Sequence, residues 1–454
     1  MSTVAVPATP VPATPGTLGP PATGRACSPA SRRALVLVAA IAVLGVGAVP
    51  VLRDVLFSPG AKTIDLSVFA DGARHVLDGQ PLFGPAFGQD LAHPLPFIYP
   101  PFAAVALTPV TLLSAPVLRL CWELASIAAL WAVVAISFGG LKARVGRYWP
   151  LLVAAITVAM IFTQPVLDEL GYGQIDLFLL LAVMVDLCRR PRWLPPGVLI
   201  GIAAGIKLVP LVFILVFLVI LNWRAIRNVL VSFVGATLIG FAVVPGDSAT
   251  FWFHEVEGTA LHWRIANYSN QSFDGMLHRL IGGAWPLAWI PLALVAVVVG
   301  LVGARAAERA GERLVAVALV ALAGLLISPI SWIHELVFIV PILGAIVGAA
   351  FERGRVLVGV AVWIVFSVSL GLPYKGLTMI TYHGSGLAGA ALEDAYGVVL
   401  FVLLLAGARC AVARWANPAW VGSGRFGSRG VVPRGVGRAE VPLEPARSPA
   451  DQTV

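Results

Sequence analysis

Long apolar runs separated by short polar loops make up most of the chain from residue 34 to residue 412. Because a transmembrane helix needs about 20 mostly apolar residues, these runs predict an all-α polytopic membrane protein with about eleven transmembrane helices. The runs lie near residues 34–57, 101–113, 117–138, 150–166, 175–188, 197–221, 228–245, 284–304, 313–328, 335–350, 355–372 and 396–412.

The two ends of the chain lack such runs. The first end is rich in Pro, Ala and Thr, and the last in Gly, Pro and Arg. These compositions cannot bury enough apolar surface to fold on their own. We therefore expect a disordered cytoplasmic N-terminus at 1–33, a transmembrane domain at 34–412 and a disordered cytoplasmic tail at 413–454.

The run 197–221 does not fit simple alternation across the membrane. Basic loops flank both of its ends, yet 25 residues rise only about 38 Å as one helix, too little for two crossings. Lys207 and Pro210 lie near its middle. A re-entrant piece satisfies both facts, and broken backbone at membrane depth requires protein or a water-filled cavity around it. Lys207 then needs an anion, from a protein carboxylate or a lipid phosphate.

Composition supports a membrane protein and excludes a soluble one. The chain is 59% hydrophobic and 12% charged, whereas soluble domains carry about 25% charged residues. The net charge of +8 comes from arginines in short loops, which the positive-inside rule places in the cytoplasm. No basic stripe with exposed aromatic residues predicts nucleic-acid binding. The four cysteines have no metal or redox spacing.

This orientation leaves four polar segments outside, at 58–100, 246–283, 329–334 and 373–395, with a short turn expected at 167–174. All seven histidines fall in or beside these segments, together with many acidic residues, Trp and Tyr. The charged residues of the cytoplasmic loops are nearly all arginine, with a few glutamates. Such an asymmetry favours an outer site for a hydroxyl-rich or phosphate-bearing substrate.

The first outer segment, from Thr63 to Phe83, predicts an amphipathic helix on the outer interface, because its apolar residues recur at helical spacing. Asp65 stands at its start. A carboxylate there can cap the helix N-terminus, or act as a general base on an attacking hydroxyl. The residues leave both readings open. His75, later in the helix, is a weaker candidate.

The remaining outer segments contain further candidates. Arg264 is an arginine in an outer segment, contrary to the positive-inside tendency. It either binds a phosphate in a bidentate manner or extends its charged end to the lipid headgroups. His334 and Glu335 are costly at membrane depth, which makes function the first hypothesis. A metal site competes with that reading, although no H-x-x-x-H or C-x-x-C spacing supports it. Lys375 is another possible phosphate partner.

An ordered series of motifs then resembles glycosyltransferase family 87, whose members are GT-C type membrane transferases. The resemblance spans roughly residues 60–345. The series consists of D-L-S-V-F from Asp65, G-Q-P-L-F from Gly79, F-I-Y-P-P-F from Phe97, G-Y-G-Q-I-D-L from Gly171, G-I-A-A-G-I-K-L-V-P from Gly201, N-Q-S-F-D-G from Asn270 and S-P-I-S-W from Ser328.

The resemblance implies a GT-C-like bundle with re-entrant pieces and an active site facing outward from the plasma membrane. It implies an inverting transfer of mannose from polyprenyl-phosphate-mannose to a lipid-linked glycan, such as a phosphatidylinositol mannoside. No cofactor, nucleotide or metal is implied. Asp65 matches the catalytic base. The family often has S-W-x-H-H, of which His334 is a match, while Glu335 replaces the second histidine.

We expect substrate contacts from residues in or near these motifs, namely His75, Tyr99, Lys207, Arg264, Asn270, Gln271, His334, Glu335 and Lys375. The expected partners are the polyprenyl-phosphate sugar, a glycolipid acceptor and membrane lipid. An arabinofuranosyltransferase using a polyprenyl-phosphate pentose is the nearest alternative. A secondary transporter is the alternative of another class, because broken helices are common in transporters.

Overall fold

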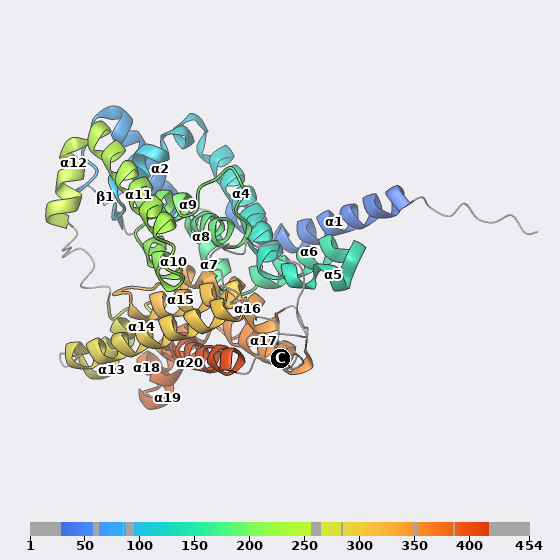
Figure 1. Ribbon diagram of the computed structural model, residues 1–454. Coiled ribbons are helices and arrows are strands. Elements are labelled where there is room, and N and C mark those ends of the chain that lie inside the picture. The colour runs from blue at the N-terminus through green and yellow to red at the C-terminus, as the bar shows by residue number, and fades with distance from the viewer. Residues whose placement is uncertain are drawn as a thin grey trace, which may run out of the picture.

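The computed structural model describes residues 29–57, 63–84, 86–87, 95–255, 265–282, 285–348, 352–384 and 386–416. Most of the two predicted terminal segments therefore lies outside the described residues, as does Arg264. The chain's first half, drawn in blue to green, forms the upper part of Figure 1, and the second half, in yellow to red, forms the lower part.

The part of the chain that the structure describes is helical apart from one antiparallel pair of two-residue strands, β1 (Ala86–Phe87) and β2 (Leu95–Pro96). This confirms the all-α prediction. The α-helices are α1 (Pro29–Phe57), α2 (Ile64–Asp78), α3 (Pro101–Ala106), α4 (Ala115–Ser137), α5 (Lys142–Val145), α6 (Trp149–Ile161), α7 (Gln164–Tyr172), α8 (Asp176–Met184), α9 (Val198–Ile206), α10 (Ile214–Val219), α11 (Trp223–Val243), α12 (Pro245–Thr250), α13 (Phe273–Ile281), α14 (Trp285–Arg309), α15 (Arg313–Ile327), α16 (Ile339–Val347), α17 (Arg353–Phe366), α18 (Leu372–His383), α19 (Gly386–Glu393) and α20 (Ala395–Ala416). Short 3₁₀ and π turns join several of them, including η1 (Thr108–Leu112), η2 (Gly139–Leu141), η3 (Gly146–Tyr148), η4 (Val185–Arg189), η5 (Val209–Phe213), η6 (Phe251–Glu255) and η9 (Ile333–Phe338).

Within the described residues, 6 helical segments are long and apolar enough to cross a membrane, and up to 7 if α7 and α8 form one bent span. The chain is therefore a multi-pass membrane protein. Further apolar helices of 10–17 residues, such as Arg313–Ile327, are too short to count by length alone. The count of about eleven stays a prediction. The segments are Arg33–Arg53, Ala115–Ser137, Gly139–Ile161, Trp223–Val243, Leu287–Arg309 and Ala395–Ala416.

Small residues let the helices pack closely, as is usual where lipid is the solvent. A Cβ atom at Gly303 of α14 would lie 2.7 Å from the Cβ of Ala408 in α20. At Gly300 it would lie 2.8 Å from the Cβ of Ala323 in α15. These three helices consequently form one tightly packed group.

The predicted outer turn at 167–174 is wrong in its extent. Thr163 is extended, and Pro165 in the first turn of α7 starts a new helix after the apolar run of α6. Helix α7 then continues to Tyr172, and α8 begins at Asp176 at an angle of 119° to it. The backbone reverses only at residues 173–175, where Gly173 has a φ of +69° that glycine adopts without strain.

The break predicted in the run 197–221 is confirmed at Lys207. Helix α9 ends at Ile206, and Lys207 is extended, with φ −145° and ψ 131°. Pro210 lies inside η5, the 3₁₀ turn that leads into α10. The path of this piece relative to the membrane stays a prediction.

The predicted amphipathic helix is α2. Leu66, Phe69 and Ala73 point inward and are at most 2% exposed. Thr63 precedes the helix in a left-handed conformation. Its amide donates to Gly171 O across 2.7 Å, which ties the start of α2 to the end of α7.

Arginines from loops far apart in sequence meet at one end of the helices. Arg414 at the end of α20 lies 2.6 Å from Glu312, just before α15, and Arg309 covers the ring of Trp415. The opposite end of α20 begins beside Gln271, whose Oε1 accepts from Gly397 N. The basic loops and the polar site loops thus occupy opposite ends of α20.

Candidate active site

The polar centre of the fold lies where the break between α7 and α8 meets the break after α9. Lys207 Nζ donates to Asp176 Oδ2, in the first turn of α8, across 2.8 Å. The same Nζ lies 2.7 Å from Glu335 Oε1 in η9. These side chains are at most 12% exposed, so water screens the ion pairs little. One ammonium therefore connects carboxylates from two separate parts of the chain.

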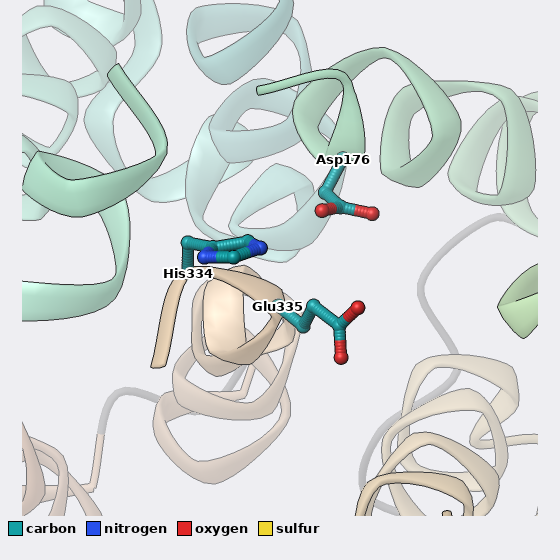
Figure 2. Close-up of side chains that lie close together, drawn as sticks. All are labelled: Asp176, His334 and Glu335. Carbon is teal, nitrogen blue, oxygen red and sulfur yellow. The ribbon is translucent and has the colours of Figure 1, made fainter. Parts of the chain in front are cut away.

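His334 lies beside the two carboxylates. Figure 2 shows Asp176 on one helix, with His334 and Glu335 on a second segment facing it. One ligand atom from each residue lies within 4.8 Å of the others. The His334 ring meets the Tyr172 ring edge to face, with centroids 6.0 Å apart.

Local structure fixes the direction of Glu335. Its Oε2 accepts a hydrogen bond from Trp332 N across 3.2 Å, which caps the first turn of η9. Its other oxygen is left for Lys207. A second acid, Glu169 in α7, accepts from Leu177 N across 2.9 Å and so caps the start of α8. Both acids hold the helix ends around the centre.

Asp65 belongs to this cluster. It is in the first turn of α2 and half-buried, and its charge acts on Tyr99, Glu169 and Tyr172. Burial raises the pKa of Tyr99, and the negative charge of Asp65 adds to the effect. Tyr99 thus stays a neutral hydroxyl, and its oxygen lies 3.5 Å from Gln174 Oε1.

The charges at this centre are unevenly distributed. Two carboxylates, Asp176 and Glu335, share the single ammonium of Lys207, and the charge of Asp65 acts on neighbouring residues of the same centre. A cluster of this kind favours positive charge on a bound group. The half-buried carboxylate of Asp65 could also accept a proton from a substrate hydroxyl.

Asp176, His334 and Glu335 form the one potential metal-binding group among the described residues. Carboxylate and imidazole ligands suit several divalent ions. The ammonium of Lys207, however, lies within 2.8 Å of both carboxylates. A metal ion bound there would compete with Lys207.

An apolar groove of about 280 Å³ borders the centre. Its wall includes Ile175, next to Asp176, and Ile206, next to Lys207. Trp122, also in the wall, donates to Gln174 O across 3.2 Å. The groove is lined by Leu107, Trp122, Ile175, Phe178, Leu179, Ala182, Leu199, Ile202, Ala203 and Ile206.

The structure brings together five of the residues predicted from sequence, namely Asp65, Tyr99, Lys207, His334 and Glu335.

Two other predicted residues are buried and bonded to the backbone. Asn270 donates to Ile265 O and Pro329 O and accepts from Ser272 N and Ser331 N. The amide of Gln271 donates to Tyr268 O and Glu393 O and accepts from Gly397 N. Their side chains tie the site loops to one another and to α20.

Two predicted residues lie apart from the centre. His75 is ten residues beyond Asp65, about 15 Å along the helix, and its Nδ1 lies 2.8 Å from Pro81 O. Lys375 is exposed and donates to Ser369 O across 3.4 Å. Arg264 lies outside the described residues. Substrate binding by these three residues stays a prediction.

Asp176, Glu169 and Gln174 were not among the predicted site residues. Asp176 and Gln174 belong to the G-Y-G-Q-I-D-L motif. The signal that could have found Asp176 is an acid at the start of an apolar run, opposite a lysine that needs an anion. Its partner Lys207 is 31 positions away, so spacing alone does not connect them.

Comparison with known proteins identifies the same family as the motif series in the sequence. The sequence profile described as glycosyltransferase family 87 matches residues 97–329. No solved structure matches the chain significantly.

Three relatives carry mannosyltransferase names. A polyprenol-phosphate-mannose-dependent alpha-(1-2)-phosphatidylinositol mannoside mannosyltransferase of Mycobacterium tuberculosis is 35% identical over 63% of this chain and 70% of its own length. A polyprenol-phosphate-mannose-dependent alpha-(1-2)-phosphatidylinositol pentamannoside mannosyltransferase of Mycobacterium tuberculosis is 35% identical over 77% of this chain and 81% of its own length. Its counterpart of the same name from Mycolicibacterium smegmatis is 35% identical over 69% and 77%. The motif series, the family profile and these relatives agree, and the chain belongs to glycosyltransferase family 87.

Proposed function

We propose that this protein transfers mannose from polyprenyl-phosphate-mannose to a lipid-linked glycan, such as a phosphatidylinositol mannoside, with inversion at the anomeric carbon. The observation that carries the proposal is the buried cluster of Asp176, Lys207, His334 and Glu335, beside which the charge of Asp65 acts on Tyr99 and Glu169. The printed names of the relatives support mannose as the sugar and polyprenol phosphate as its carrier.

Asp65 acts as the general base. An acceptor hydroxyl oxygen attacks the anomeric carbon of mannose while its proton passes to the Asp65 carboxylate. The bond between the anomeric carbon and the phosphate oxygen breaks, and polyprenyl phosphate leaves with the electron pair. A single displacement of this kind inverts the anomeric configuration. The nearby carboxylates favour the positive charge that develops on the sugar ring.

Lys207 positions the cluster. Its ammonium already bonds to Asp176 and Glu335, so binding the donor phosphate would require one of these buried pairs to break. Breaking such a pair is costly. The two ion pairs favour a positioning role over direct binding of phosphate. The ring of His334, next to the cluster, remains a candidate donor of a hydrogen bond to the leaving phosphate.

The apolar groove supports a lipid-linked donor. An isoprenoid chain is fully apolar, and the groove offers an apolar wall that includes Ile175 and Ile206, the sequence neighbours of Asp176 and Lys207 in the charged centre. A chain lying there would present its phosphate to the cluster. Holding the donor at the reacting atoms in this way lowers the entropic cost of the reaction.

A direct assay tests the proposal. The purified protein in detergent is given polyprenyl-phosphate-mannose and a phosphatidylinositol mannoside, and the product is followed by mass spectrometry and its anomeric configuration by NMR. We expect Asp65→Asn to lower kcat by roughly 10²- to 10⁴-fold, the range of general base catalysis. Asp71→Asn is the matched control, because this carboxylate lies on the same helix and pairs with Arg74.

Three other results of this assay would contradict part or all of the proposal. Unchanged transfer by Asp65→Asn contradicts the assignment of the base. Transfer of arabinose but not mannose by the wild-type protein favours the pentose alternative. If wild-type protein transfers neither sugar but moves a solute into vesicles, the enzyme reading fails.

A further inference from the structure

We infer that three tyrosines, Tyr172, Tyr268 and Tyr374, form a binding surface for the sugar rings of the acceptor. This inference rests on the proposed function and adds the position and chemistry of the acceptor site. The three residues come from the end of α7, the loop before α13 and the first turn of α18. We call them the tyrosine wall.

The wall begins at the reactive centre. Tyr172 meets His334 at 6.0 Å between ring centroids, and its hydroxyl also feels the charge of Asp65. Tyr172 and Tyr268 interact electrostatically with each other and with Asp168. The first ring of the wall therefore packs against the histidine beside the cluster and lies within electrostatic range of the candidate base.

The wall continues to the surface. The rings of Tyr268 and Tyr374 lie 6.3 Å apart at 64°. Tyr172 is 39% exposed and Tyr374 61% exposed, while Tyr268 is half-buried against the core. All three rings are thus at least partly exposed, so the wall is open to a ligand beside the buried reaction centre.

Local structure holds the outer rings in place. The backbone oxygen of Tyr268 accepts from Gln271 Nε2 across 2.7 Å. Tyr374 follows Pro373 in the first turn of α18, which Gly371 starts in a left-handed conformation at φ +50°. Surfaces fixed by backbone contacts of this kind bind with little loss of conformational entropy.

The chemistry of the wall fits a sugar. The face of a tyrosine ring is electronegative, and it favours the electropositive C–H face of a pyranose. Polar groups that suit hydroxyls flank the rings. Asp168 accepts from Gln164 across 2.7 Å and is half-buried, and Lys375 follows Tyr374 on the surface. The apolar groove has no such polar lining, which separates the acceptor wall from the place proposed for the lipid tail.

Tyrosines also gather at membrane interfaces to anchor helices. An anchoring role would alter stability or the overall yield of protein, whereas an acceptor site alters the acceptor KM selectively. The experiment is therefore steady-state kinetics on the purified protein, with polyprenyl-phosphate-mannose held saturating and phosphatidylinositol mannoside varied, and then the reverse.

We expect Tyr374→Ala to raise the acceptor KM roughly 3- to 10-fold, the range that one aromatic contact supplies, with kcat and the donor KM unchanged. Tyr374→Trp keeps an aromatic face and retains a low acceptor KM. Tyr172→Ala lowers kcat as well, because its ring also touches His334. Tyr148→Ala is the matched control, since Tyr148 is 46% exposed and lies next to the basic loop.

The outcomes separate this inference from the proposed function. If the wild-type protein transfers no mannose, the proposed function fails first. If it does transfer mannose, but Tyr374→Ala leaves the acceptor KM unchanged or raises both KM values equally, the tyrosine wall is not the acceptor site. An acceptor KM that rises in Tyr374→Ala and stays low in Tyr374→Trp supports it.

Discussion

At the scale of single residues, Lys207 controls the stability of the site. Two carboxylates, Asp176 and Glu335, lie within 2.8 Å of its ammonium in a buried setting. Without the ammonium, two like charges would remain close together with little solvation. Removing one partner of a buried ion pair costs about 3–5 kcal/mol, because the remaining charge is left uncompensated.

Lys207→Met tests this role. We expect this variant to lose roughly 3–5 kcal/mol of stability and most of its transferase activity. The measurement is thermal unfolding in detergent, with intrinsic fluorescence as the readout. The triple variant Lys207→Met, Asp176→Asn, Glu335→Gln removes all three charges and should recover much of the stability but not the activity. Lys375→Met is the control on an exposed lysine, and a loss of stability equal to that of Lys207→Met would contradict the argument.

Some residues of the site are predictable from the amino-acid sequence and others are not, for physical reasons. The cost of a lysine at membrane depth predicted that Lys207 needs an anion, but not which one. Asp176 was not predicted as a site residue, because an acid before an apolar run is also common at the start of an ordinary helix. Asn270 and Gln271 were identified as polar motif residues. Only the three-dimensional structure shows that their side-chain amides bind backbone groups of distant loops.

At the scale of elements, the break at residues 173–175 positions α2, the helix that carries the proposed base Asp65. A Cβ atom at Gly173 would lie 2.7 Å from Leu66 Cβ in α2 and 3.3 Å from Thr63 Cβ. The amide of Thr63 bonds to Gly171 O just before the break. The start of α2, and with it Asp65, therefore rests directly on a glycine.

Gly173→Ala tests this contact. Its φ of +69° makes alanine strained by about 1–2 kcal/mol, and the added methyl displaces α2. We expect a loss of transferase activity of at least roughly tenfold, since small shifts of a catalytic group are costly. Gly171→Ala is the control, because nothing lies within 4 Å of its Cβ position and it is helical. Equal activity of the two variants would show that α2 does not depend on this contact.

Hydrophobic runs predicted most helices but not the places where they bend. The run 150–166 predicts one element, although Thr163, Gln164 and Pro165 follow the end of α6 at Ile161 closely. The break at Lys207 was predictable, since a charge and a proline interrupt the run there. Breaks marked by polar residues and prolines are thus predictable in a membrane protein, whereas the angle at a break, such as the 119° between α7 and α8, depends on tertiary packing.

At the scale of the whole molecule, the two ends of the bundle differ in charge. Basic loops meet at one end, where Arg414 pairs with Glu312 and Arg313 donates to Leu187 O. The loops around the candidate site meet at the other, where Gln271 bonds to the backbone of Glu393 and Gly397. Because short basic loops stay in the cytoplasm, we propose that the site faces outward.

Cysteine labelling tests this orientation. Cys27, Cys121, Cys188 and Cys410 are first replaced by serine, and single cysteines are then introduced as Lys375→Cys or Arg224→Cys, both at exposed positions. We expect a membrane-impermeant maleimide to label Lys375→Cys in intact cells. Arg224→Cys should react only after the membrane is permeabilised, because it lies in the first turn of α11 within a basic cluster that the positive-inside rule places in the cytoplasm.

A second pair of positions makes the result independent of local accessibility. Asn267→Cys lies beside Tyr268 in the tyrosine wall, and Arg144→Cys lies in α5 in another basic loop; both positions are exposed. The two site positions should react together in intact cells, and the two basic positions together after permeabilisation. The reverse pattern would place the reaction in the cytoplasm. The acceptor would then have to reach Asp65 from the inner leaflet.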